Sequence, residues 1–280
     1  MNVAQAIHAA AQRLSTTSDT ARLDAEVLMA HALACTRSAL LLRHMTDPAP
    51  AAYAPLIDRR ATHEPVAYIT GTQEFWGLPL RVTRDTLIPR GDSETIVEAA
   101  LAAAPAPARV LDCGTGTGAL LLATLSERPQ AQGIGIDASP AALTIAAANA
   151  AALGLSDRAQ MRLADWTQPD WAQGLGQFDL ILANPPYVET NADLSPSVRD
   201  YEPASALFAG PDGLDDYRRL IPQLPPLLTP KGIVVIEIGH TQAESVSTIG
   251  QQAGFITQLH HDLAGRPRAL LFLRESGDTR

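Results

Sequence analysis

Leu180-Ile181-Leu182-Ala183-Asn184-Pro185-Pro186-Tyr187 is the stretch around which the rest of the chain is interpreted. Its apolar first half, preceded by Phe178-Asp179, is typical of a buried parallel strand. The two prolines end that strand, because proline has no N–H and a fixed φ. Asn184 is therefore expected at the carboxyl end of a strand, where open α/β sheets bind their ligands.

The groups around Asn184 suit a planar ligand that carries an NH2 group. Asn184 offers a side-chain carbonyl and Pro185 a backbone carbonyl, while neither Pro185 nor Pro186 has an N–H that would compete for them. Tyr187 adds a flat aromatic face. Asn-Pro is also a common turn signal, so the tetrapeptide alone would equally describe a strand that ends in a turn. Its place after a glycine-rich strand–loop–helix favours the ligand site.

From residue 109 onward, strand-like and helix-like segments alternate, which predicts a doubly wound α/β sheet. Strands are expected at 109–112, 133–137, 159–163, 178–183, 232–238, about 255–259 and 268–273. Helices are expected near 118–127, 140–153, 212–228 and 242–253. A further helix is expected to begin at Asp92 or Ser93 as its N-cap and to end near Ala103.

The first of these strands leads into the glycine-rich turn Asp112-Cys113-Gly114-Thr115-Gly116-Thr117-Gly118. Glycines allow positive φ and the close approach of a ligand, and the helix that follows offers free N–H groups. Asp137 ends the next strand, where a carboxylate can accept hydrogen bonds from ribose hydroxyls. Asp165-Trp166 follows the third strand and could form an adenine pocket, although Asp165 is also a possible turn residue.

Two cofactors are compatible with a glycine-rich loop of this kind. Gly114, Gly116 and Ala119 satisfy the dinucleotide fingerprint G-x-G-x-x-G/A, which favours an NAD enzyme. Asp112, however, would place a negative charge near the pyrophosphate of a dinucleotide. The same charge suits the amino group of S-adenosylmethionine, and together with Asn184 it favours a methyltransferase.

Composition excludes several other classes of protein. The 280 residues carry a net charge of −9, which counts against a nucleic-acid substrate. Cys35 and Cys113 are far apart, so we expect neither a disulfide scaffold nor a metal site, and a reducing cytoplasm is the simplest location. The N-terminus lacks a basic leader and no apolar run is long enough for a bilayer, so we expect a cytoplasmic monomer without membrane association.

The chain before the sheet divides in two. Residues 1–73 predict a helical domain, since Ala21, Ala25, Leu28 and Ala32 fall on one helical stripe. Residues 74–90 predict a β-hairpin linker with strands at 75–82 and 86–88, and residues 91–280 the sheet domain. The helical domain either caps the larger domain or helps to hold a macromolecular substrate.

Several stretches together resemble the release-factor glutamine methyltransferase (PrmC/HemK) family, and the likeness extends over nearly the whole chain. They are Asp24-Ala25-Glu26-Val27-Leu28, Tyr68-Ile69-Thr70-Gly71, Glu74-Phe75, Leu87-Ile88-Pro89-Arg90, the Asp112–Gly118 loop, Asn184–Tyr187, Tyr201-Glu202-Pro203, Gly210-Pro211-Asp212-Gly213-Leu214, Glu237-Ile238-Gly239 and Asp262-Leu263-Ala264-Gly265.

The resemblance implies a seven-stranded, mostly parallel, Rossmann-like methyltransferase sheet behind a small helical domain. It implies methyl transfer from S-adenosylmethionine to the side-chain amide nitrogen (N5) of the glutamine in the Gly-Gly-Gln motif of class I peptide chain release factors, a reaction of translation termination. The residues expected to bind the cofactor are Asp112, Gly114, Thr115, Gly116, Thr117, Gly118, Asp137, Asp165, Trp166 and Asn184. Those expected to hold the glutamine and to carry the catalysis are Asn184, Pro185, Pro186 and Tyr187.

One departure from the family pattern lies at Pro89-Arg90-Gly91-Asp92-Ser93-Glu94, because the family usually has proline where this chain has Gly91. Glycine loosens a helix start that proline would preset. Two other functions remain to be weighed. Adenine-N6 methylation of DNA fits the tetrapeptide but lacks a basic recognition region, and a non-catalytic binding protein would not need the glycine loop, Asp137 and Asn184 together.

Overall fold

The computed structural model describes residues 1–274, which form two compact units. The helical unit comprises Met1–Thr72 together with Leu194–Glu202, and the sheet unit comprises Gln73–Asp193 and the chain from Pro203 onward. The segment Leu194–Glu202 therefore belongs with the helices although it follows the Asn184–Tyr187 stretch in the sequence. Sequence reasoning assigned that segment to the sheet domain.

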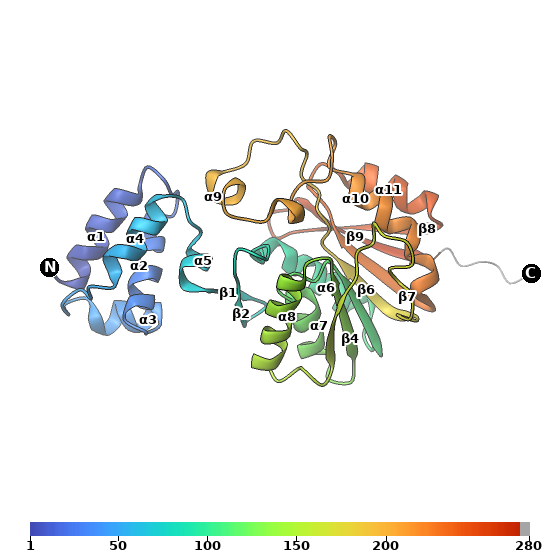
Figure 1. Cartoon of the computed structure of the whole chain (residues 1–280), viewed down its shortest axis with the longest axis horizontal. Coiled ribbons are helices and arrows are strands. Elements are labelled where there is room, and N and C mark those ends of the chain that lie inside the picture. The colour runs from blue at the N-terminus through green and yellow to red at the C-terminus, as the bar shows by residue number, and fades with distance from the viewer. Residues whose placement is uncertain (275–280) are drawn as a thin grey trace, which may run out of the picture. The chain divides into compact units, whose positions relative to one another are not determined.

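Short helices build the helical unit (Figure 1). They are α1 (Val3–Leu14), α2 (Ala21–Ala32), α3 (Arg37–Ala39), the π-helical turn Leu40–His44, α4 (Tyr53–Ala61), α5 (Val66–Thr70) and α9 (Pro196–Arg199). The apolar faces of α1, α2 and α4 enclose a core that includes Ile7, Leu14, Leu28, Met29 and Ile57. Asn2 and Gln5 form a reciprocal capping box at the start of α1, which satisfies two otherwise free N–H groups.

Polar contacts tie the ends of the helical unit together. Arg60 in α4 forms an ion pair with Asp24 in α2 at 2.7 Å, and both side chains are buried. The Tyr201 hydroxyl donates to the backbone oxygen of Thr62 at 2.7 Å, which holds the segment Leu194–Glu202 against the helices.

Among residues 1–274, no single helix is long and apolar enough to cross a membrane. Within that range, only the bent pair Ala21–Ala32 and Arg37–His44 together has the length and composition of a span.

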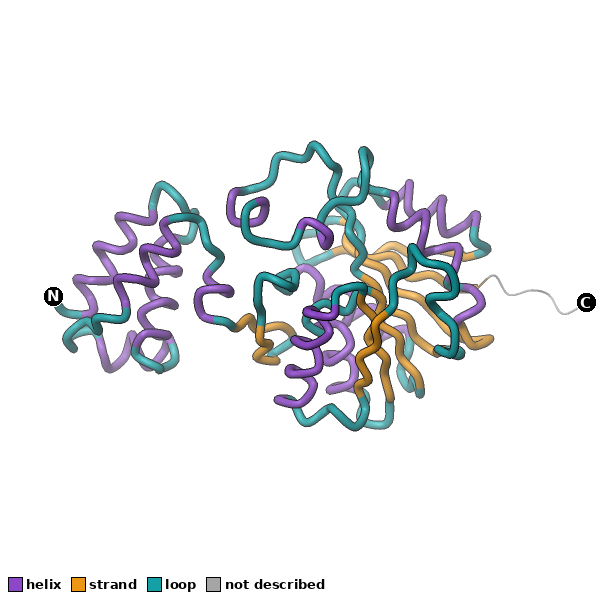
Figure 2. The backbone as a smooth tube through the Cα atoms, in the orientation of Figure 1, coloured by secondary structure: helices purple, strands orange, loops and turns teal. Residues whose placement is uncertain are grey.

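A seven-stranded sheet forms the centre of the sheet unit (Figure 2). Its strands are β3 (Arg109–Cys113), β4 (Gln132–Asp137), β5 (Ala159–Leu163), β6 (Phe178–Ala183), β7 (Leu228–Glu237), β8 (Phe255–His261) and β9 (Pro267–Arg274). They follow the order β5-β4-β3-β6-β7-β9-β8, and β9 runs in the opposite direction to the other six strands. The predicted seven-stranded, mostly parallel, doubly wound sheet is confirmed.

Helices cover both faces of this sheet because its strands are apolar on both sides. On one face, α6 (Glu94–Ala103) and α7 (Ala119–Glu127) pack against side chains such as Leu180 and Leu182. On the other, α10 (Asp215–Leu220) and α11 (Ala243–Gln252) pack against the alternate residues Ile181 and Ala183. The helix α8 (Pro140–Ala152) follows β4, with Ser139 capping its first turn.

The predicted hairpin exists, but its strands were wrongly placed. The strands are β1 (Thr72–Phe75) and β2 (Leu78–Arg81), and Thr86–Ile88 forms no strand. Trp76 and Gly77 both have positive φ, 53° and 70°, as a two-residue type I′ turn requires. The turn therefore falls earlier than expected. Phe75, only 1% exposed, belongs to the sheet core, so the hairpin is part of the sheet unit rather than a free linker.

One helix prediction was wrong, and another was confirmed: α6 begins after Ser93 at its N-cap and ends at Ala103. The segment 212–228 is not one helix: α10 ends at Leu220, and two 3-10 turns, Ile221–Gln223 and Pro225–Leu227, follow it. Pro222, Pro225 and Pro226 have no N–H with which to continue the helix. At the start of α6, a 3-10 turn, Gly91–Ser93, precedes the helix, and Ser93 occupies the N-cap position without a side-chain cap hydrogen bond.

Candidate active site

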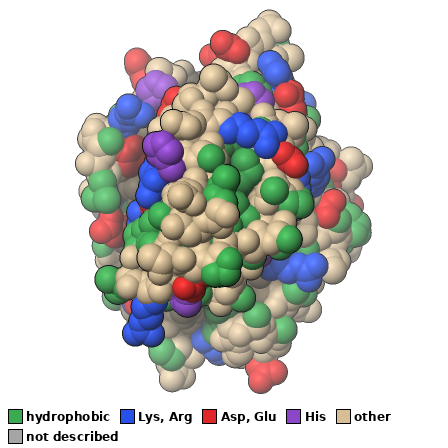
Figure 3. Space-filling view, turned by 90° about the vertical axis from the view of Figure 1, so that its left-hand side faces the viewer, with side chains coloured by type: hydrophobic (Ala, Val, Ile, Leu, Met, Phe, Trp, Pro, Cys, Tyr) green, Lys and Arg blue, Asp and Glu red, His purple; other side chains and the backbone are tan. Residues whose placement is uncertain are grey.

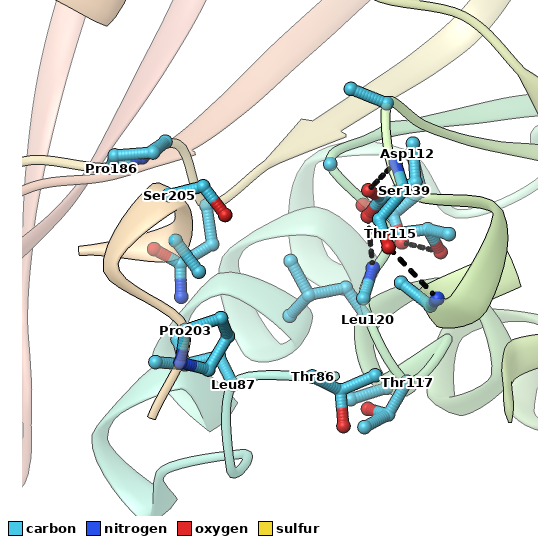
Figure 4. Close-up of a pocket in the computed structure, with 18 of the residues that line it drawn as sticks. Thr86, Leu87, Asp112, Thr115, Thr117, Leu120, Ser139, Pro186, Pro203 and Ser205 are labelled. Atoms are coloured by element: carbon cyan, nitrogen blue, oxygen red, sulfur yellow. Dashed lines mark hydrogen bonds between the residues drawn. The ribbon is translucent and has the colours of Figure 1, made fainter. Parts of the chain in front are cut away.

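A cavity of about 480 Å³ lies at the carboxyl ends of the parallel strands in the sheet unit. Four neighbouring strand ends contribute to its lining: Asp112 from β3, Asp137 from β4, Asp165 after β5 and Asn184 after β6. Figure 4 shows two opposed walls, with Asp112, Thr115 and Ser139 on one side and Pro186, Pro203 and Ser205 on the other. The sheet thus brings together groups that are far apart in the sequence.

Most of the residues predicted from the sequence line this cavity. Those that do are Asp112, Gly114, Thr115, Gly116, Thr117, Asp137, Asp165, Trp166, Asn184 and Pro186. Gly118, Pro185 and Tyr187 are not among the lining residues. Gly118 has φ +84° and a Cβ there would lie 2.9 Å from Leu122 Cδ1, so this glycine allows the turn into α7 rather than the approach of a ligand.

The glycine loop directs its N–H groups into the protein. The N–H groups of Gly114 and Thr115 donate to the Ile136 carbonyl at 2.9 and 2.8 Å, and that of Gly116 donates to Asp137 Oδ2 at 2.9 Å. A dinucleotide site needs such groups for the pyrophosphate, and here they already have partners. Two carboxylates also line the cavity beside the loop. The cavity therefore favours a ligand without phosphate at this position.

Asp112 is the most unusual group in the cavity. Its side chain is 1% exposed, and Oδ2 accepts a hydrogen bond from Thr115 Oγ1 at 2.6 Å. Oδ1 is buried and has no hydrogen-bond partner among the described residues. Burial raises the pKa of this carboxyl from 3.8 to about 7. Such an orphaned acceptor fits a cationic donor on a ligand, which would supply both the missing hydrogen bond and the missing counter-charge.

Asp137 is held at a fixed angle by two backbone groups. Oδ2 accepts from Gly116 N and Oδ1 from Ser139 N, each at 2.9 Å. Burial raises the pKa of Asp137, although its backbone hydrogen bonds act in the opposite direction. Each carboxylate oxygen retains a further acceptor site. A rigid carboxylate of this kind at the end of the second strand suits a pair of neighbouring hydroxyl groups.

Trp166 forms an aromatic wall that other residues hold in place. Its indole N–H donates to Asp216 Oδ1 at 3.0 Å, and the ring lies so close to Gly114 that a Cβ there would be 3.1 Å from it. Asp165 accepts from the N–H and hydroxyl of Thr167 at 2.8 and 2.7 Å, and the Thr167 hydroxyl leads the causes that lower its pKa. Asp165 is therefore a turn residue and a lining residue at once.

The Asn184–Tyr187 stretch divides between the cavity and the protein interior. Asn184 and Pro186 are half-buried and line the cavity, whereas Pro185 is buried. The Tyr187 hydroxyl donates to Glu237 Oε1 at 3.1 Å, and the ring packs against the core beside α10 and α11. Burial raises the pKa values of both Tyr187 and Glu237. From the sequence, the Tyr187 ring was expected to face the ligand. The ring instead packs against the core and does not line the cavity.

Sequence reasoning missed a large part of the lining. Two loops complete the cavity, the first with Asp85, Thr86, Leu87, Pro89 and Arg90 and the second with Pro203, Ser205 and Ala206. Asp216, which orients Trp166, was missed as well. The only sequence signals were the family-like stretches Leu87–Arg90 and Tyr201–Pro203, which carried no assigned role. Neither loop has a periodic pattern that would place it beside the glycine loop.

The cavity thus combines a buried acceptor for a cation, a carboxylate for hydroxyl groups, an aromatic wall and the polar amide of Asn184. No metal-binding cluster of three or more His, Cys, Asp or Glu occurs in residues 1–274. Binding and orientation of a cationic, hydroxyl-bearing ligand next to an amide or amine are the chemistry that this set of groups supports.

Comparisons with known proteins agree over nearly the whole chain. Residues 5–71 match the family model of the PrmC N-terminal domain, and residues 106–261 match that of a methyltransferase domain. A release factor glutamine methyltransferase from Cereibacter sphaeroides is 45% identical over 96% of this chain and 97% of its own length. One from Moorella thermoacetica is 42% identical over 98% and 99%.

A solved structure supports the fold alone. An O-methyltransferase family protein from Burkholderia thailandensis is 17% identical and superimposes with a TM-score of 0.50 over 67% of this chain and 57% of that one.

Proposed function

This chain belongs to the release factor glutamine methyltransferase family, and we propose that it methylates the side-chain amide nitrogen (N5) of the glutamine in the Gly-Gly-Gln motif of peptide chain release factors, with S-adenosylmethionine as methyl donor. The single observation that carries the proposal is the cavity at the strand ends. It holds an orphaned buried carboxylate oxygen, on Asp112, in the same space as the Asn184 amide.

The chain's own residues fit S-adenosylmethionine part by part. Asp112 Oδ1 would accept from the amino group of the methionine portion, and Asp137 from the ribose hydroxyls. Trp166 and Asp165 would pack against the adenine and accept from its amine. The bound donor supplies a methyl group on a sulfonium, which is already an excellent leaving group. No metal ion or covalent protein nucleophile is required for such a transfer.

Asn184 would activate and aim the substrate amide. An amide nitrogen is a poor nucleophile, because its lone pair is delocalised into the carbonyl. Asn184 lines the cavity, and its side-chain oxygen would accept from one N–H bond of the amide, which returns electron density to nitrogen and fixes its direction of attack. Preorganised dipoles of this kind contribute ~3 kcal/mol each to lowering a barrier.

Orientation supplies much of the remaining acceleration. The nitrogen must approach the methyl carbon in line with the breaking bond, and holding two reactants in such a geometry replaces a bimolecular encounter. Pro186, Pro203 and Leu87 line the wall opposite the glycine loop and would keep water away from the reacting atoms (Figure 4). The methylated nitrogen then loses one of its two protons, which leaves a secondary amide.

The rival function is methylation of adenine N6 in DNA, since adenine also presents an NH2 group. Several observations favour the glutamine. The relatives that match nearly the whole chain are named for release factors, and the chain carries a net charge of −9. Acidic and basic side chains are interspersed over the face shown in Figure 3, without a broad basic area. A duplex would meet no continuous positive surface there.

The helical unit is proposed to dock the release factor, and the enzyme to act as a monomer in the cytoplasm during translation termination. The helical unit contains an apolar core and ion pairs, whereas every residue that lines the cavity at the strand ends lies in the sheet unit. The proposal is tested by incubating the protein with radiolabelled S-adenosylmethionine and either a purified release factor or duplex DNA. Label in the release factor alone supports it, and label in DNA alone overturns it.

A further inference from the structure

Tyr187 is fixed at both of its ends by residues that lie outside the cavity lining. Its hydroxyl donates to Glu237 Oε1 at 3.1 Å, and its backbone oxygen accepts from Gln242 Nε2 at 3.0 Å. Glu237 is the last residue of β7, and Gln242 occupies the N-cap position of α11. Tyr187 itself follows Asn184 by three residues, with two conformationally restricted prolines between them. A restraint on Tyr187 is therefore transmitted to Asn184.

The Gln242 side chain joins three backbone segments. Besides the Tyr187 oxygen, Nε2 donates to the Gly213 oxygen at 3.2 Å, and Oε1 accepts from the Gly239 N–H at 3.0 Å. Its amide thus uses both hydrogens and its oxygen, which fixes its orientation. Gly213 allows this approach: a Cβ there would lie 2.3 Å from the Tyr187 oxygen and 2.8 Å from Gln242 Nε2. The absence of a side chain at Gly213, within the Gly210–Leu214 stretch, therefore makes the contact between Gln242 and Tyr187 possible.

Burying the carboxylate of Glu237 costs folding free energy. Its side chain is 1% exposed, and Oε2 has no hydrogen-bond partner in the described part of the chain. A second tyrosine, Tyr217, donates its hydroxyl to the Glu237 backbone oxygen at 2.9 Å, which fixes the end of β7. Burial raises the pKa of this carboxyl, and Ser93, the charge of Arg268 and Tyr187 oppose that rise, so the cost of burying the carboxylate is only partly offset. What it does provide is a directional anchor for the Tyr187 hydroxyl.

We propose that Glu237 and Gln242 are positioning residues that clamp Tyr187 and so hold Asn184 in the orientation needed for methyl transfer. The inference rests on the proposed function and assigns these two residues a role in it. Tyr187 then acts as the anchor of the tetrapeptide rather than as an aromatic surface for the substrate. Neither Glu237 nor Gln242 lines the cavity, so both act through Tyr187.

The clamp predicts a particular kinetic signature. Misplacing a group by about 1 Å can reduce a rate by about a hundredfold, even when the substituted residue is remote from the chemistry. Because the cofactor contacts on the glycine loop are untouched, kcat should fall while the cofactor affinity and the KM for the release factor stay constant. A merely destabilising substitution would instead lower the amount of folded enzyme and leave kcat per folded molecule unchanged.

The most direct variant is Gln242→Glu, which keeps the size of the side chain and replaces two N–H donors by an oxygen that repels both carbonyls. The matched control is Gln251→Glu, the same change at an exposed position of α11. We expect Gln242→Glu to lower kcat by about ten to a hundredfold, in line with the cost of misplacement. Gln251→Glu should leave kcat unchanged. Thermal denaturation checks that both proteins are folded at the assay temperature.

The other end of the clamp is tested by Tyr187→Phe, Glu237→Ala and Glu237→Gln. Tyr187→Phe and Glu237→Ala remove the hydroxyl–carboxylate contact, and each should lower kcat by about tenfold, corresponding to ~1.4 kcal/mol. Glu237→Gln retains an oxygen that accepts from Tyr187 and should restore most of the activity. If the tyrosine ring served instead as a surface for the substrate, Tyr187→Phe would keep wild-type kcat and KM, which would overturn the proposal.

A second readout does not depend on the enzymatic activity. Hydrogen–deuterium exchange of the peptide 187–193, in which the N–H groups of Val188 and Thr190 donate to Leu207 and Gly210, should accelerate in Gln242→Glu and Tyr187→Phe. Unchanged exchange, with kcat within about twofold of wild type for both variants, refutes the clamp. If the wild-type protein methylates no release factor, the proposed function fails, and the exchange measurement alone then decides whether Tyr187 is clamped.

Discussion

Asp112→Asn is expected to stabilise the protein without its cofactor and at the same time to weaken cofactor binding. Burial raises the pKa of Asp112 from 3.8 to about 7, so above pH 7 the folded protein carries a charge that its surroundings disfavour. Each pKa unit corresponds to about 1.4 kcal/mol, which gives an upper value of about 4 kcal/mol for the cost of that charge in the folded state.

The sign of the pH dependence follows from the raised pKa. The protonated carboxyl is favoured by folding, so its contribution is fully present below the unfolded pKa and is lost as the pH rises through about 7. Asparagine is neutral at every pH and keeps an oxygen that can accept from Thr115 Oγ1. The advantage of Asp112→Asn in unfolding free energy should therefore be largest above pH 7, shrink as the pH falls, and vanish below about pH 4.

Two assays measure the two effects. Scanning calorimetry without cofactor at pH 8 should show a Tm that is higher in the variant, by on the order of 10 °C if the full upper value applies. Titration calorimetry with S-adenosylmethionine should show a Kd weaker by about one to two decades, because a charge-assisted hydrogen bond is worth ~1.5–3 kcal/mol. A variant with unchanged or lower Tm at pH 8, or with wild-type cofactor affinity, would refute the role given to this carboxylate.

Three further predictions concern other parts of the sheet unit. Asp137→Ala should weaken cofactor binding by ~1.5–3 kcal/mol while the protein stays folded, and unchanged affinity in calorimetry would contradict the assignment. Asn149→Ala should lower the unfolding free energy by ~3 kcal/mol in chemical denaturation, because the buried Asn149 amide bonds both backbone groups of Arg81 and the oxygen of Thr117. Residues 73–280 alone should fold and bind cofactor but methylate intact release factor poorly, and full activity would show that the helical unit is a mere cap.

The parts of the site that the sequence predicts are those fixed by local patterns. The apolar run Leu180–Ala183 has to be a buried strand, and the prolines after it have to end that strand, so the location of Asn184 follows from steric rules alone. Asp112 and Asp137 end or nearly end strands of the same kind, so the sheet topology is enough to bring them to one edge.

The parts that the sequence did not predict depend on contacts between distant segments. The Tyr187 ring packs inward because Glu237, fifty residues later, offers an acceptor for its hydroxyl. The residues Thr86 and Leu87 look like a strand by their composition. The type I′ turn at Trp76–Gly77 instead pairs β1 with β2, which ends at Arg81, so Thr86 and Leu87 are left in a cavity loop. Segment 194–202 follows the helical unit because of side-chain contacts such as that of Tyr201 with Thr62, which no periodicity reveals.

The central claim, that Asn184 presents a glutamine amide to the methyl donor, is tested most directly by peptide mass spectrometry of a release factor treated with wild-type protein or with Asn184→Ala. The wild type should add the mass of one methyl group to the glutamine of the Gly-Gly-Gln motif. The variant should do so about 10²–10³ times more slowly, with comparatively little loss of cofactor affinity. Methylation of duplex DNA with the release factor untouched, or an Asn184→Ala variant as active as the wild type, would contradict the account.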